Sequence, residues 1–82
     1  MYSIEFSEYA EKQFSKLDSQ VQQRIVSVLD RIRIRPIDHL VKLIGIEAYK
    51  CRIGDYRTIC TVNHESRTIF VVKVGHRKDV YE

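Results

Sequence analysis

Apolar and polar residues alternate from Tyr2 to Ser7. Tyr2, Ile4 and Phe6 are apolar, and the residues between them are polar. A period of two places the apolar side chains on one face of a strand. The chain is therefore predicted to open with a strand that is buried on one side.

The pattern then changes to a helical period over two successive segments. Ser7 can cap a first helix that runs to about Leu17, because its hydroxyl can accept a hydrogen bond from the first turn. Residues 19–22 fit a capping box that opens a second helix, and Pro36 forbids its continuation. The apolar residues that recur at helical spacing along this second helix are Val21, Ile25, Val28, Leu29 and Ile32. Two amphipathic helices joined by a short polar turn predict a helical hairpin that covers a sheet.

The second half of the chain is predicted to form strands. Residues 37–47 have no clear period and form a connector with a bend at Gly45. Strands are predicted at residues 48–53, 56–63 and 68–75, and Gly54 begins a two-residue turn of type II′ between the first two. The predicted fold class is α+β: an N-terminal strand, a two-helix hairpin and a three-strand antiparallel meander, with the helices on one face of the sheet.

Length and composition are typical of a single folded domain. A chain of 82 residues can enclose only one core, and 44% hydrophobic with 30% charged residues is ordinary for globular proteins. We therefore expect one domain over residues 1–82. The opening residues carry an acid, Glu5, and no long apolar run, which predicts a cytoplasmic protein without a membrane segment. Cys51 and Cys60 lack the paired spacing of a zinc site and are expected to be free core thiols.

The positive charge is unevenly distributed. Residues 1–41 hold six Lys and Arg against six Asp and Glu, whereas residues 42–82 hold eight against five. The net charge of +3 therefore comes entirely from the second half. Such a bias favours a polyanionic partner such as RNA or DNA.

The predicted hairpin concentrates part of this charge on one face. A two-residue turn at residues 54–55 sets Arg52 opposite Arg57. One face then carries Lys50, Arg52 and Arg57. The other face, which we expect under the helices, carries Tyr49, Cys51, Ile53, Tyr56 and Cys60. Directly opposed arginines repel each other and so lower the stability of the fold, and residues that lower stability in this way are typical of functional sites. The alternative interpretation is that this basic strand pair is simply a solvated surface.

Two runs of residues resemble a known family. The runs are YKCRIGDYR at residues 49–57 and VKVGHRKDVY at residues 72–81. They resemble the Y-[KR]-x-[KR]-x-G-x-Y-R and V-G-H/K-R…V-Y signatures of the RelE branch of the RelE/ParE toxin superfamily. The resemblance implies a metal-independent endoribonuclease that cuts mRNA in the ribosomal A site and is inhibited by a RelB-like antitoxin encoded beside it. It implies no small-molecule cofactor.

The resemblance also implies an active site. The family's positions fall on Lys50, Arg52, Arg57, Arg77 and Tyr81. RNA cleavage by the 2′-hydroxyl needs a proton acceptor, a proton donor and cations that neutralise the charge that develops on the phosphorane. Arginine forks suit the charge role. Lys50, His76 and Tyr81 are the candidate proton carriers, with His76 at a position where some members have Lys.

Two other functions remain open at this point. A ParE-type toxin shares the fold and inhibits DNA gyrase without cutting RNA, and an inactive relic would bind an antitoxin only. Other enzyme classes are disfavoured, because the sequence has no paired carboxylates, Ser-His-Asp set or phosphate-binding glycine loop.

Overall fold

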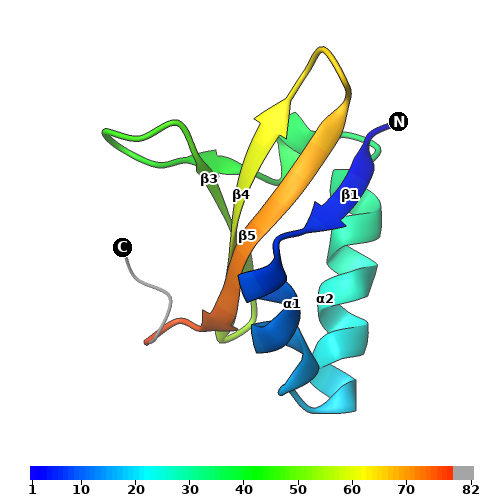
Figure 1. Cartoon of the computed structure of the whole chain (residues 1–82), viewed down its shortest axis with the longest axis vertical. Coiled ribbons are helices and arrows are strands. Elements are labelled where there is room, and N and C mark those ends of the chain that lie inside the picture. Colours follow the sequence, from blue (N-terminus) through cyan, green and yellow to red (C-terminus); the bar gives the residue numbers. More distant parts are fainter. Residues whose placement is uncertain (79–82) are drawn as a thin grey trace.

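The computed structural model describes residues 1–78 and confirms the predicted α+β fold (Figure 1). The elements are β1 (Ser3–Phe6), α1 (Glu8–Ser15), α2 (Ser19–Ile32), the 3-10 helix η1 (Pro36–Asp38), β2 (Val41–Lys42), β3 (Tyr49–Ile53), β4 (Tyr56–Asn63) and β5 (Thr68–His76). They form one five-stranded sheet in the order β1-β5-β4-β3-β2. β1 runs parallel to β5, and the other neighbours are antiparallel. Within the described part, no helix has the length and apolar character needed to span a bilayer.

The prediction for the connector was incomplete, because it contains the short strand β2. Val41 pairs with Lys50 and Lys42 pairs with Tyr49, so β2 forms one edge of the sheet. The Lys42 Nζ atom lies 3.1 Å from Glu47 Oε1, across the loop that joins β2 to β3. A strand of two exposed residues has too few positions to show a period, so the sequence pattern could not reveal it.

The two helices begin in different ways. Ser7 caps α1 as predicted, because the Ala10 amide donates to Ser7 Oγ at 3.0 Å. The capping box predicted for α2 was wrong: the cap residue is Asp18, and its side chain makes no capping hydrogen bond. Gln22 Nε2 instead donates to the Phe14 carbonyl at 2.9 Å and so ties α2 to α1.

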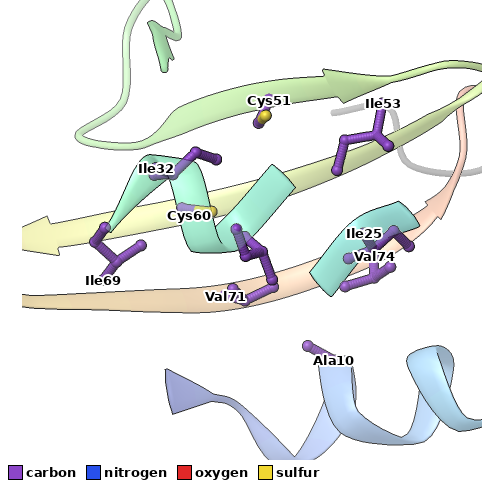
Figure 2. Packing of buried hydrophobic residues seen from close by; sticks show 10 residues of the cluster. Ala10, Ile25, Ile32, Cys51, Ile53, Cys60, Ile69, Val71 and Val74 are labelled. Atoms are coloured by element: carbon purple, nitrogen blue, oxygen red, sulfur yellow. The ribbon is translucent and has the colours of Figure 1, made fainter. Parts of the chain in front are cut away.

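The core lies between the two helices and one face of the sheet (Figure 2). Its buried members are Ala10, Ile25, Leu29, Ile32, Cys51, Ile53, Cys60, Ile69, Val71 and Val74. The two cysteines are free and buried, as predicted. Burial raises the pKa of Cys51 to about 11 and that of Cys60 to about 12, because a thiolate is poorly solvated there.

A β-bulge in β5 changes which residues face the core. Ile59 pairs with Lys73, whereas the next residue, Cys60, pairs with Val71, so Val72 is an extra residue in β5. Val71 and Val74 are consequently both buried although they are three positions apart. We call the sheet face turned away from α1 and α2 the outer face.

Candidate functional site

The β3–β4 hairpin places three cations on the outer face. Arg52 pairs with Arg57 and Lys50 pairs with Ile59, which confirms the predicted register. The alternating residues Cys51, Ile53 and Thr58 are buried on the helix side. Side chains in a strand point alternately to opposite faces, so Lys50, Arg52 and Arg57 share the outer one.

The turn that sets this register depends on a glycine. Gly54 has φ +61°, a left-handed conformation that favours glycine, while Asp55 has no positive φ. This agrees with the predicted type II′ turn. A Cβ at position 54 would also come within 3.1 Å of Arg24 Nη1, from α2. A side chain here would therefore strain the turn and disturb the register of the arginine pair.

The three cations differ in burial. Arg52 is exposed, whereas Lys50 and Arg57 are half-buried, and the Nε atom of Arg57 is buried. Lys50 and Arg52 form no ion pair with any residue of the described range 1–78. Three cations on one face, with Arg52 exposed directly opposite Arg57, favour the binding of anions there.

The sheet adds a cation that the sequence reasoning missed. Lys73 is exposed and pairs with Ile59 from the other side, so the outer face has a row of Lys50, Ile59 and Lys73. The next row consists of Arg52, Arg57 and Gly75. We call Lys50, Arg52, Arg57 and Lys73 the basic face. The bulge at Val72 determines that Lys73 points to the outer face. The pattern of apolar and polar residues around Val72 does not indicate this bulge.

Arg77 lies near the Arg52 and Arg57 end of the basic face. Its backbone amide donates to the Asp55 carbonyl at 2.8 Å, which holds it beside the hairpin turn. Its side chain is exposed. The backbone of Arg77 is therefore adjacent to the turn that joins the two strands bearing Arg52 and Arg57.

His76 is placed away from the basic face. It pairs with Tyr56, and the two rings meet edge to face with centroids 5.5 Å apart. Tyr56 pairs with the buried Ile53, so this contact lies on the helix side of the sheet. The His76 Nδ1 atom accepts a hydrogen bond from the Lys78 amide at 3.3 Å. The remaining candidate, Tyr81, lies outside the described residues.

The basic face is part of an open sheet rather than a cavity. An open groove of about 420 Å³ lies elsewhere, between β1 and α2, with Ile4, Phe6 and Leu29 in its lining. Within residues 1–78, no three His, Cys, Asp or Glu side chains are close enough to share a metal ion. A flat cationic surface suits an extended polyanion better than a small molecule, which needs enclosure.

Comparison with known proteins identifies the family. The model of the family described as "ParE toxin of type II toxin-antitoxin system, parDE" matches residues 4–81. This chain belongs to the RelE/ParE superfamily of type II toxins. A protein of Escherichia coli named as a RelE-like toxin is 35% identical over 85 residues, which cover 98% of this chain and 90% of that protein.

Solved structures of RelE toxins share the fold of this superfamily member. The E. coli RelBE toxin–antitoxin complex contains a chain with a TM-score of 0.81 and 30% identity, covering 93% of this chain and 96% of that one. A chain of the RelBE2 complex of Mycobacterium tuberculosis has a TM-score of 0.86 at 22% identity, and the match covers 93% of this chain and 98% of that one. The second likeness shows the fold alone, whereas the first, together with the E. coli relative, supports a RelE-like toxin.

Proposed function

We propose that this toxin is a ribosome-dependent endoribonuclease that cuts mRNA in the A site, through attack of a 2′-hydroxyl on the adjacent phosphorus. The observation that carries the proposal is the basic face itself. Lys50, Arg52 and Arg57 share the outer face, and Arg77 is held beside the same turn. These are the positions at which the RelE-branch signatures place cations. Such a surface supports binding of RNA and neutralisation of the charge that develops in cleavage.

The arginines are assigned to the phosphate. Guanidinium groups offer paired donors that match phosphate oxygens and remain charged throughout the reaction. Arg57 is half-buried, so its guanidinium is better fixed than that of the exposed Arg52. We assign Arg57 and Arg77 to the developing charge, and Arg52 mainly to binding.

Among the three candidate proton carriers, we favour His76 least. His76 contacts Tyr56 on the helix side, so it is poorly placed to reach a phosphate on the outer face. Lys50 is half-buried on the outer face, on the same strand as Arg52, and is our candidate base among the described residues. Tyr81 retains its proposed role in orienting the 2′-hydroxyl or stacking on a base.

We infer dependence on the ribosome because the candidate site offers few groups that could accept or donate a proton. An enzyme without a well-placed general base needs a substrate that is already aligned for in-line attack. Positioning of this kind can contribute on the order of 7 kcal/mol or more. We propose that the ribosome supplies it, in the cytoplasm where translation takes place.

We further propose that a RelB-like antitoxin, encoded beside the toxin, inhibits it. Solved relatives include toxin–antitoxin complexes with RelB. An exposed basic face would bind cellular RNA unless another chain covered it, and an acidic segment complements its charge. The partner would act by occupying the basic face or by displacing the chain that follows β5.

A ParE-type mode of action is the second candidate. The matching family model carries the ParE description. As stated for the family resemblance, a toxin of the ParE branch would inhibit DNA gyrase without cutting RNA. A pair of opposed arginines on an open sheet face suits the binding of an RNA phosphate backbone. The basic face therefore favours the nuclease over the gyrase inhibitor.

One experiment separates the two. The toxin and its Arg57→Ala variant are induced in cells, with and without the neighbouring gene's product, and mRNA ends are mapped by primer extension. The nuclease proposal expects A-site cuts from the original chain, far fewer from the variant, and rescue by the antitoxin. Lys12→Ala, which removes an exposed cation from α1, is the matched control. Inhibition of supercoiling by purified gyrase, without mRNA cuts, would establish the ParE-type alternative.

A further inference from the structure

An exposed aromatic ring continues the basic face along the outer face. Phe70 is 39% exposed, and its neighbours Ile69 and Val71 are fully buried on the helix side. Phe70 pairs with Thr61 on β4 and with Glu5 on β1. Thr61 is two residues beyond Ile59, so the Phe70 row lies about 7 Å from the row that contains Lys73.

The bulge in β5 is what brings Phe70 and Lys73 to the same face. Residues three apart in a regular strand point to opposite faces, but the extra residue Val72 restores a common direction. Ser7 holds the bulge: its amide donates to the Val71 carbonyl at 2.9 Å, and its hydroxyl donates to the Val72 carbonyl at 3.2 Å. The placement of ring and ammonium is therefore anchored from the start of α1.

An ammonium and an aromatic ring one row apart match the two parts of a nucleotide. Single-stranded nucleic acids are commonly bound by cations that follow the backbone and aromatic side chains on which bases stack. The carboxylate of Glu5, next to Phe70 on β1, repels a phosphate. The phosphate is thereby favoured on the Lys73 side and the base over Phe70.

We propose that Phe70 and Lys73 form a subsite for a nucleotide of the RNA at a distance from the cleaved bond. Lys73 binds a phosphate of the single-stranded RNA, and the Phe70 ring stacks on a base. The inference rests on the proposed nuclease function, because it extends the path of the same RNA from the arginine pair across β4 and β5. It adds contacts to the substrate and no step to the reaction.

Binding of an RNA that cannot be cut tests the subsite. Purified toxin is titrated into fluorescent 2′-O-methyl octaadenylate at several salt concentrations. For Lys73→Ala, the slope of log affinity against log salt should fall by about 0.7, the amount expected from one lost phosphate contact on a single strand. Phe70→Leu should weaken binding by roughly five- to a hundredfold without changing that slope, because leucine keeps an apolar side chain but removes the stacking surface.

Two controls keep the result interpretable. Phe70→Tyr retains the ring and should bind RNA as the original chain does, which separates stacking from disturbance of the sheet. Lys12→Ala, on α1, should leave both affinity and salt slope unchanged. Melting temperatures of all variants report whether each is folded.

The outcomes separate this subsite from the proposed function. Unchanged affinity in Phe70→Leu together with an unchanged salt slope in Lys73→Ala would overturn the subsite, while A-site cutting by the original chain would leave the nuclease standing. Weaker binding to the antitoxin but not to RNA in Phe70→Leu would also overturn it, and would assign the ring to the protein partner. A chain that neither binds nor cuts RNA would overturn both.

Discussion

Arg52 and Arg57 lie directly opposite each other on neighbouring strands of the outer face. Like charges at directly paired positions of an antiparallel ladder destabilise it. We expect Arg52→Ala to raise stability by a few tenths of a kcal/mol while it lowers RNA cleavage. Thermal unfolding and a cleavage assay on the same preparation test this. A lower melting temperature would show that Arg52 stabilises the hairpin and that repulsion is not the dominant effect.

Arg57→Ala and Arg77→Ala should each reduce cleavage by about a hundredfold or more. That is the scale of loss when one fixed charge donor is removed from a transition state. Arg57 is half-buried, and the backbone of Arg77 is held at Asp55 beside the hairpin turn. Single-turnover cleavage of mRNA on programmed ribosomes measures the effect, and circular dichroism checks the fold. A variant with full toxicity would remove its arginine from the site.

His76→Gln should change the cleavage rate by less than about threefold. The imidazole contacts Tyr56 on the helix side, and its Nδ1 atom accepts from the Lys78 amide, so it does not face the proposed phosphate site. Glutamine can keep a hydrogen bond but cannot carry a proton at neutral pH. The decisive readout is the dependence of the rate on pH. A large loss of rate together with the disappearance of one limb of that profile would make His76 a proton carrier.

The buried thiols should make the fold sensitive to alkali. Burial raises the pKa of Cys51 to about 11 and of Cys60 to about 12, above the ordinary value of 9.0. The unfolded chain therefore loses these protons first, so the stabilising effect is complete below about pH 9 and is lost as the pH rises through 11 to 12. Between pH 9 and the pKa of each buried thiol, the free energy of unfolding should fall by about 1.4 kcal/mol per pH unit for that thiol.

Cys60→Ala tests this assignment through the slope rather than through absolute stability, because the smaller side chain also leaves a cavity. Denaturant unfolding between pH 8 and pH 11 should show a shallower decline for the variant than for the original chain. Equal declines would mean that other groups, and not this thiol, cause the alkaline loss.

The features that the sequence predicted correctly are local ones. The Gly54 turn and the period of two around it determine the Arg52–Arg57 pairing without reference to the rest of the chain. The Ser7 cap is equally local, since donor and acceptor lie within one helical turn. For these features, backbone geometry alone decides the outcome.

The features that could not be predicted depend on distant partners. The bulge at Val72 is held by Ser7 from the other end of the chain, and it decides that Lys73 joins the basic face. The pairing of His76 with Tyr56, which places the imidazole on the helix side of the sheet, depends on the same shift of register. The capping box predicted at Ser19 did not form: α2 is capped at Asp18, and Gln22 donates instead to the carbonyl of Phe14 in α1.

The most direct test of the account is cleavage with and without the ribosome. Purified toxin is mixed with one mRNA, either free or bound to ribosomes with a defined codon in the A site, and the ends are mapped over time. The account predicts a cut within the A-site codon on the ribosome, and cleavage of the free mRNA that is slower by several orders of magnitude. Equally fast cutting of the free mRNA would contradict ribosome dependence, and no cut on either substrate would contradict the nuclease itself.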